Sequence, residues 1–318
     1  MQGFMPKVTG STDVYLIVGD PVAQVRAPEI FNLIFASMAI DAVLIPARVA
    51  PQHLQAFAKT AFLASNIKGL VVAIPHKAPM LGLLDVCSEL GSIAGAVNGV
   101  RRNADGSLEG GQFDGEGFVA SLAYFNIAYA NKRVLIVGAG GGGTAIGASL
   151  AVARSTGAAR EVALFDIVPG KAQQVAARIA AATGVKIYAA TSSDPTGFDV
   201  VVNATPLGLQ LTDPMPCDVT RLGPHAALVD IVMKDQPTSL VRAARARGLN
   251  AQPGFEMLIQ QTHLYLDFFG FAEAARRVRE DATFLRERIY PAEMRDEIHR
   301  PFEAGKHSDK VVISAGHY

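Results

Sequence analysis

A run of apolar residues that leads directly into a cluster of glycines constrains this chain more than any other feature. Val134 to Val137 are all aliphatic, and the next six residues, Gly-Ala-Gly-Gly-Gly-Gly, contain the pattern Gly-x-Gly-x-x-Gly. In a Rossmann unit the first glycine permits a tight turn, the second lets the backbone approach a pyrophosphate, and the third allows the following helix to pack closely. N–H groups at the start of that helix bind the phosphates. Unless the loop lacks a ligand, we predict that it binds a dinucleotide through Gly138, Ala139, Gly140, Gly141, Gly142 and Gly143.

An acidic residue after the next apolar run bears on which dinucleotide binds. Val162 to Phe165 predict a second strand, and Asp166 follows it. An acid at this position hydrogen-bonds the adenosine ribose hydroxyls, and its charge would repel the 2′-phosphate of NADP. The next cation is Lys171. The sequence therefore favours NAD over NADP, unless Asp166 is only a solvated residue at a strand end.

Strands that alternate with helical segments predict a two-domain α/β protein. The 318 residues fit two domains at about 150 residues each. We expect an N-terminal α/β domain over residues 1–114, a Rossmann NAD(P)-binding domain over 115–255, and C-terminal helices within 256–318. Expected strands cover residues 14–18, 42–46, 69–74, 97–102, 107–112, 134–137, 161–165, 186–188, 200–203 and 227–231. Expected helices cover 28–39, 53–65, 115–125, 143–155, 170–183, 255–268 and 272–288, and the tail after Pro291 is either a capping helix or partly disordered.

Composition and charge exclude several classes of function. The 29 Lys and Arg residues balance 29 Asp and Glu residues, so nucleic acid is not an expected partner. No apolar run approaches the roughly 20 residues of a membrane span, and the N-terminus lacks the apolar core of a signal peptide. The two cysteines and scattered histidines lack metal-ligand spacing, so we expect no metal. We expect a cytoplasmic protein, monomeric or homodimeric, that acts on a small molecule.

Two charged residues at predicted strand ends are candidates for proton transfer. Lys77 follows a predicted strand by a few residues, and Asp114 follows a predicted hairpin. Ligands of open α/β sheets bind at the carboxyl ends of strands. A Lys–Asp pair there can move a proton to or from a hydroxyl while a nicotinamide takes the hydride. Considered separately, either residue could be an ordinary surface charge.

Several short motifs, in order over residues 14–270, resemble those of the shikimate/quinate dehydrogenase family. They are Gly19-Asp20-Pro21-Val22-Ala23, Pro75-His76-Lys77, Ala94-Gly95-Ala96-Val97-Asn98, Asp114-Gly115, the glycine loop, Asn203-Ala204-Thr205-Pro206-Leu207-Gly208, and Met257-Leu258 with Gln261. The resemblance implies NAD(P)-linked oxidation of a ring hydroxyl of shikimate, quinate or a related cyclic polyol, and reduction of the 3-dehydro ketone. It also implies that residues 1–114 form a substrate-binding domain completed by C-terminal helices within 256–318. By the resemblance Lys77 is the catalytic proton-transfer residue and Asp114 pairs with it. It also implies substrate contacts from Asn98 and Gln261, and cofactor contacts from Asn203, Thr205 and Met257.

Positions that are usually polar in this family are apolar here. The family has a Ser-x-Ser-Pro segment that binds the substrate carboxylate, and Val25 and Ala27 replace the serines. Ala73 and Met233 replace a Thr and a Tyr, and Glu256 replaces a Gly. Arg26 could supply a compensating charged contact or could point to solvent. Because a lost polar partner discriminates strongly between substrates, we expect the chemistry to persist and shikimate to be a poor substrate.

Three other interpretations remain open at this stage. The chain could be an ordinary NADP-dependent shikimate 5-dehydrogenase of the aromatic amino-acid pathway. It could be a non-catalytic NAD-binding sensor, although a sensor would not need Lys77 and Asp114. It could also be another two-domain dehydrogenase of similar architecture, and architecture alone does not assign chemistry.

Overall fold

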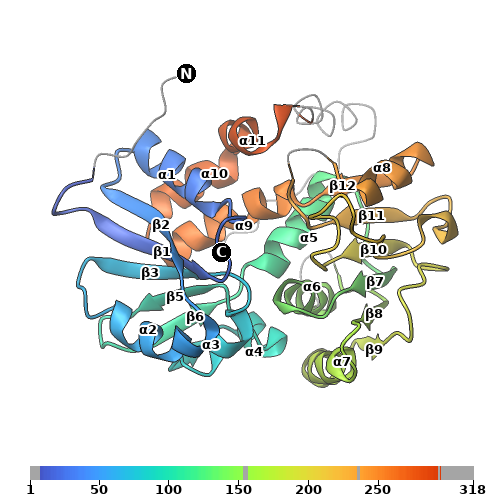
Figure 1. The fold of residues 1–318 in the computed structure, drawn as a ribbon, viewed down its shortest axis with the longest axis horizontal. Coiled ribbons are helices and arrows are strands. Elements are labelled where there is room, and N and C mark those ends of the chain that lie inside the picture. The colour runs from blue at the N-terminus through green and yellow to red at the C-terminus, as the bar shows by residue number, and fades with distance from the viewer. Residues whose placement is uncertain (1–7, 153–156, 235–236, 293, 295–318) are drawn as a thin grey trace.

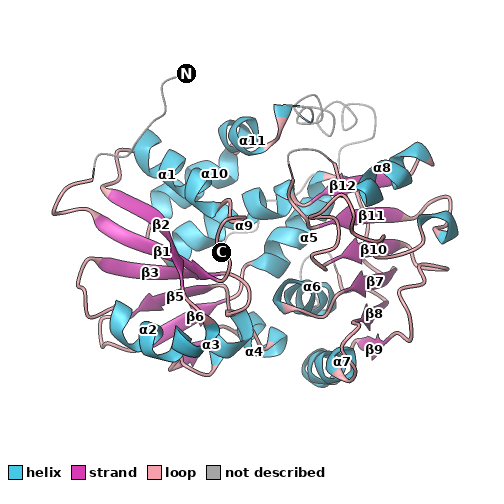
Figure 2. Ribbon diagram, in the orientation of Figure 1, coloured by secondary structure: helices cyan, strands magenta, loops and turns pink. Residues whose placement is uncertain are grey.

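Two six-stranded sheets lie side by side in the computed structural model, which describes residues 8–152, 157–234, 237–292 and 294. Helices pack around both sheets, as Figure 1 shows by position in the chain and Figure 2 by secondary structure. This arrangement confirms the predicted α/β class, with an N-terminal part and a Rossmann-type part. Within the described residues, every helix is too short or too polar to cross a membrane.

The first sheet combines parallel strands on one side with an antiparallel hairpin on the other. Its strand order is β2-β1-β3-β5-β6-β4, in which β1 pairs in parallel with β2 and β3, and β5 runs antiparallel to β3 and β6. The apolar run of β1 is buried because neighbours cover both of its faces. The elements are β1 (Asp13–Gly19), α1 (Ala27–Ser37), β2 (Ala42–Arg48), η1 (Pro51–His53), α2 (Leu54–Ala61), β3 (Ile67–Val72), α3 (Lys77–Leu81), β4 (Val86–Cys87), α4 (Glu89–Ala94), β5 (Gly99–Arg102) and β6 (Leu108–Gly111).

The second sheet is wholly parallel among its described pairs and has the strand order of a Rossmann domain. The order is β12-β11-β10-β7-β8-β9, so the chain starts in the middle at β7, moves outward to β9, and then returns to build the other half. Ligands bind where such an order reverses, between β7 and β10. The elements are β7 (Arg133–Val137), α6 (Gly141–Ala151), β8 (Glu161–Phe165), α7 (Lys171–Thr183), β9 (Lys186–Ala189), β10 (Val200–Asn203), η2 (Val219–Arg221), β11 (Ala227–Asp230), α8 (Ser239–Ala246) and β12 (Asn250–Pro253).

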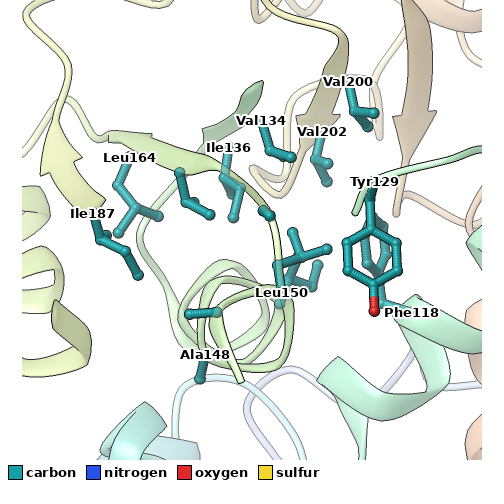
Figure 3. Close-up of a cluster of buried hydrophobic side chains, with 14 of the residues drawn as sticks. Phe118, Tyr129, Val134, Ile136, Ala148, Leu150, Leu164, Ile187, Val200 and Val202 are labelled. Carbon is teal, nitrogen blue, oxygen red and sulfur yellow. The ribbon is translucent and has the colours of Figure 1, made fainter. Parts of the chain in front are cut away.

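Two helices connect the part of the chain that contains the first sheet with the part that contains the second. The chain passes from the first sheet to the second through α5 (Asp114–Tyr124) and returns through α9 (Phe255–Phe268), followed by α10 (Ala272–Glu280) and α11 (Thr283–Ile289). Phe118 of α5 belongs to the core cluster around α6, which Figure 3 shows. The long apolar face of α9 joins the core beside β1 and α1. We propose that the domain boundaries lie near residues 114 and 255, where these two helices begin.

Glycines in α5 allow it to lie unusually close to its two neighbours. A Cβ atom at Gly115 would lie 2.2 Å from the Ala145 carbonyl oxygen of α6. A Cβ atom at Gly117 would lie 2.6 Å from the Met257 carbonyl oxygen of α9. Real Cβ atoms essentially never approach so closely, so neither position tolerates a side chain without movement. The first residue of α5, Asp114, is thereby held close to both halves of the molecule.

The sequence prediction differs from the structure at several elements. The expected helix over residues 272–288 is two helices, because the backbone at Asp281 is extended, with φ −149° and ψ 112°, and ends the first of them. The Asp281 carboxylate accepts a hydrogen bond from the Thr283 N–H across this break. The helix expected to run to residue 155 ends at Ala151, and residues 153–156 lie outside the described residues. Most of the tail after Pro291 also lies outside them. The short elements α3, α4, β4, α8 and β12 were not predicted.

Candidate active site

Lys77 and Asp114 meet between the two sheets. Lys77 is the first residue of α3, and its Nζ lies 2.6 Å from Asp114 Oδ2 at the start of α5. The two side chains are 17% and 6% exposed. The methylenes of Lys77 lie against Gly141, where a Cβ atom would come within 3.1 Å of them. A mostly buried ion pair therefore lies beside the first residue of α6, the helix that follows the glycine loop.

The segment from Gly95 to Asn98 supports both members of this pair. The Val97 N–H donates to the Lys77 carbonyl oxygen at 3.0 Å. The Gln112 amide donates to the Ala96 carbonyl oxygen at 3.2 Å, and its oxygen accepts from the Asp114 N–H at 2.9 Å. These hydrogen bonds fix the backbones of Lys77 and Asp114 relative to one another.

Asn98 and Gln261 lie side by side in this region. Asn98 is fully buried, and its Oδ1 accepts a hydrogen bond from the Phe113 N–H at 2.9 Å. Its Nδ2 therefore points toward Gln261 of α9, whose Oε1 lies 3.4 Å away. Tyr265 donates its hydroxyl to the Asn98 carbonyl oxygen at 3.0 Å. Burial and the nearby charge of Asp114 raise the Tyr265 pKa well above its usual value, so this tyrosine stays protonated.

The residues at the predicted carboxylate-facing positions are apolar and pack on one core cluster. Val25, Ala73 and Met233 come from three distant segments, and all pack against the core cluster that contains α9. Ala27 is buried at the start of α1. Arg26 lies between two of these residues in the sequence, and its Nε is 2.8 Å from Glu29 Oε1. The Arg26 guanidinium therefore already has a carboxylate of this chain as a partner.

The glycine loop has the geometry that a pyrophosphate requires. Gly138 has φ +104°, which a residue with a side chain rarely adopts. At Gly143 a Cβ atom would lie 1.9 Å from the Gly138 carbonyl oxygen, whereas at Gly140 it would meet no atom within 4 Å. Open space at the second glycine, beside the N–H groups that begin α6, fits a bound phosphate. The loop residues thus fit a dinucleotide.

Asp166 is tied to the glycine loop and is not a freely solvated side chain. Its Oδ2 accepts from the Ala139 N–H at 2.8 Å and from Lys171 Nζ at 2.9 Å, and its Oδ1 accepts from the Val168 N–H at 2.9 Å. Burial acts to raise the pKa of Asp166, but the hydrogen bonds from Val168 and Lys171 outweigh burial and keep the pKa below its usual value. The carboxylate is therefore ionised at neutral pH.

Asn203 and Thr205 shape the loop after β10. Asn203 is buried and donates to the Leu207 carbonyl oxygen and to Asp230 Oδ1, at 3.0 and 2.9 Å. Its own Oδ1 accepts from the Thr205 N–H and hydroxyl, at 3.0 and 2.6 Å. Sequence reasoning did not assign a role to Asp230, although an acid at the carboxyl end of an apolar strand was a usable signal. Burial raises the pKa of Asp230 to about 6 despite its hydrogen bonds.

The remaining candidates are more weakly connected to the site. Met257 is 8% exposed and belongs to the core cluster around α6. His76, next to Lys77, is fully buried, with Nε2 2.7 Å from the Val49 carbonyl oxygen. Among the described residues, His, Cys, Asp and Glu side chains do not form a group of three or more that could hold a metal.

Comparison with known proteins gives consistent matches. Residues 17–100 match the family model of the shikimate dehydrogenase substrate binding domain. A shikimate dehydrogenase (NADP(+)) from Rubrobacter xylanophilus is 34% identical over 261 residues, which cover 81% of this chain and 90% of that protein. The structure of 5-ketofructose reductase from Gluconobacter sp. superposes with a TM-score of 0.71 at 28% identity, covering 86% of this chain and 99% of that one. Quinate dehydrogenase from Corynebacterium glutamicum, in complex with NAD, gives 0.72 at 27% identity, with 85% and 98% covered.

Proposed function

The chain belongs to the shikimate dehydrogenase family, and we propose that it uses Lys77 and Asp114 to interconvert a ring hydroxyl and a ketone on a polyhydroxylated substrate. It is an oxidoreductase of the shikimate/quinate type with a pyridine nucleotide as cofactor. One observation carries the assignment of the pair: the 2.6 Å contact between Lys77 Nζ and Asp114 Oδ2, mostly buried and packed on the glycine loop's helix. An ion pair in that position can exchange a proton with a substrate hydroxyl.

Each polar residue has a separate part in the proposed reaction. The bound nicotinamide supplies or accepts a hydride at the substrate carbon. In the oxidation direction the neutral amine of Lys77 takes the hydroxyl proton and becomes an ammonium, which Asp114 orients and whose charge it compensates. In the reduction direction this ammonium donates the proton to the oxygen that was the ketone. The amides of Asn98 and Gln261 bind neighbouring hydroxyls. Residues 138–143 hold the pyrophosphate, and the Asn203–Thr205 loop and Met257 border the nicotinamide.

We propose NAD as the preferred nucleotide. Support comes from Asp166, whose ionised carboxylate stands after β8 and would repel a 2′-phosphate. Lys171 opposes this effect, because its ammonium is 2.9 Å from the same carboxylate. We expect kcat/KM to favour NAD by about tenfold or more, equivalent to about 1.4 kcal/mol. In initial-rate assays Asp166→Asn should shift the ratio toward NADP, and Lys171→Met should shift it toward NAD. A wild-type preference for NADP would contradict this assignment.

We further propose that the substrate lacks a ring carboxylate. Val25, Ala27, Ala73 and Met233 offer no hydrogen-bonding side chain except a thioether, and Arg26 is engaged by Glu29. A carboxylate placed against such a surface would lose its water without a replacement partner, which costs several kcal/mol. The name of the 5-ketofructose reductase describes a keto sugar, and a neutral ketone of that kind needs no charged partner at the positions of these apolar side chains.

A matched pair of substrates tests this proposal. Shikimate and its methyl ester share every ring hydroxyl and differ only at the carboxyl group, which is anionic in the acid and is neutral and one methyl larger in the ester. We expect kcat/KM for the ester to exceed that for shikimate by about tenfold or more. The double variant Val25→Ser/Ala27→Ser should reverse that order by restoring hydroxyl donors. Robust turnover of shikimate at a micromolar KM, with NADP, would instead identify an ordinary shikimate 5-dehydrogenase.

A further inference from the structure

A buried ion pair joins the start of α9 to α11. Arg286 donates through Nε to Glu256 Oε2 at 3.1 Å and through Nη2 to Oε1 at 2.6 Å. The side chains of Arg286 and Glu256 are 8% and 0% exposed. Gln260 Nε2 and the Tyr290 hydroxyl donate to the same carboxylate, at 2.7 and 3.4 Å. The Glu256 carboxylate thus accepts hydrogen bonds from its own helix, from α11 and from the residue after α11.

The Arg286 guanidinium also contacts α5. Its Cζ lies 4.4 Å from the centroid of the Tyr124 ring, at the end of that helix. Burial acts to lower the pKa of Arg286, but its hydrogen bonds to Glu256 and the negative charge of that carboxylate outweigh burial and raise the pKa, so the guanidinium stays charged. One side chain therefore contacts both helices that connect the two sheets, and Figure 1 shows these helices between the sheets.

The same two helices carry residues of the proposed site. Asp114 begins α5, while Met257 and Gln261 follow Glu256 within the first two turns of α9. Near Gly117 the helices touch so closely that a Cβ atom there would lie 2.7 Å from Gln261 Cβ. Any rotation of the first turn of α9 against α5 would therefore move Gln261 relative to Asp114 and Lys77.

Stability alone is a weak reason to bury such a pair. The cost of removing both charges from water largely offsets their attraction, and a well-packed apolar pair is often at least as stable. What a bidentate pair adds is a fixed geometry, because the planar guanidinium and the carboxylate fit in one orientation. We propose that Glu256 and Arg286 are a positioning pair that holds the first turn of α9 against α5, and thereby Met257 and Gln261 in register with Lys77 and Asp114. This inference rests on the function proposed above.

A double variant separates positioning from stability. Glu256→Gln and Arg286→Met, made singly, should each lower the melting temperature by several degrees, because each leaves a buried polar partner unsatisfied. Glu256→Met/Arg286→Met should recover most of that loss. If the pair positions α9, kcat of the double variant stays about tenfold or more below wild type, since a misplacement of about 1 Å can cost 10²-fold. The dissociation constant of NADH, from fluorescence titration, should stay within about twofold.

Two further measurements make every outcome decisive. Arg286→Lys keeps the charge but loses the bidentate contact, so it should fold and show a reduced kcat. Hydrogen exchange at the backbone of the first turn of α9 should be faster in both variants, and it does not depend on turnover. The proposal would be overturned by a folded double variant whose kcat and exchange rates equal those of the wild type. If the double variant does not fold, wild-type kcat and exchange rates in Arg286→Lys would overturn it. If the wild-type protein turned over none of the polyhydroxylated substrates, the proposed function would be refuted. The hydrogen-exchange rates would then still test whether Glu256 and Arg286 hold the first turn of α9.

Discussion

Lys77→Met is expected to lower kcat by about 10²- to 10⁴-fold, the usual contribution of a positioned proton-transfer group. The methionine keeps the Cβ and Cγ methylenes, and its sulfur replaces the Cδ methylene that packs on Gly141, but it has no ammonium to exchange a proton with the substrate. Nucleotide binding should remain near the wild-type level, because the pyrophosphate is proposed to contact the backbone of residues 138–143. Steady-state rates in both directions, combined with NADH titration, measure the two effects separately.

Two further variants show whether the loss of kcat in Lys77→Met comes from the missing proton-transfer group or from reduced stability. Removing the ammonium leaves Asp114, only 6% exposed, without its ion-pair partner, and this costs stability. Lys77→Met/Asp114→Asn should recover the melting temperature and leave kcat low. Lys68→Met makes the same substitution at a side chain that is 43% exposed, and it should change neither quantity. If Lys77→Met retained kcat within a few-fold of wild type, another group or water would be the proton carrier.

Structural features that depend only on residues close together in the sequence could be predicted. The run from Val134 to Gly143 determined a strand, a turn and a helix start, because the glycine positions follow from local backbone geometry. The apolar runs of β1, β3 and β8 were predicted for the same reason, since a strand covered on both faces needs no polar alternation. Element ends were less accurate, and α3 and α4 are too short to show a helical period.

Contacts between distant residues could not be predicted from local patterns. Lys77 and Asp114 are 37 residues apart. Their positions at predicted strand ends made them candidates, but each could have been an ordinary surface charge until the family resemblance paired them. Glu256 was noted as a replacement for glycine, but its partner Arg286 is 30 residues further on. Gly115 and Gly117 gave no signal, because their role depends on which helices lie opposite them. Proximity of this kind is set by tertiary packing, which a single sequence does not display.

Gly143→Ala is expected to destabilise the Rossmann half strongly. The new Cβ atom would lie 1.9 Å from the Gly138 carbonyl oxygen, so the loop or the start of α6 must move. Inserted atoms in a packed region typically cost about 1–3 kcal/mol, and a clash with rigid backbone belongs at the upper end of that range. For a chain of 318 residues that unfolds as one unit, about 3 kcal/mol lowers the melting temperature by roughly 4–5 °C. Thermal unfolding without ligand measures this directly.

Gly140→Ala is the matched control, and it should have the opposite profile. Its Cβ atom would meet no atom within 4 Å, and its φ of −77° suits any residue, so the melting temperature should stay near wild type. The same methyl group would occupy the space in which the pyrophosphate is proposed to lie, so the NADH dissociation constant should rise by about tenfold or more. A Gly140→Ala variant that binds NADH as tightly as wild type would show that the phosphates do not approach this residue. A stable Gly143→Ala variant would show that α6 can move away from the turn, and that close packing at the third glycine is not needed to hold the loop.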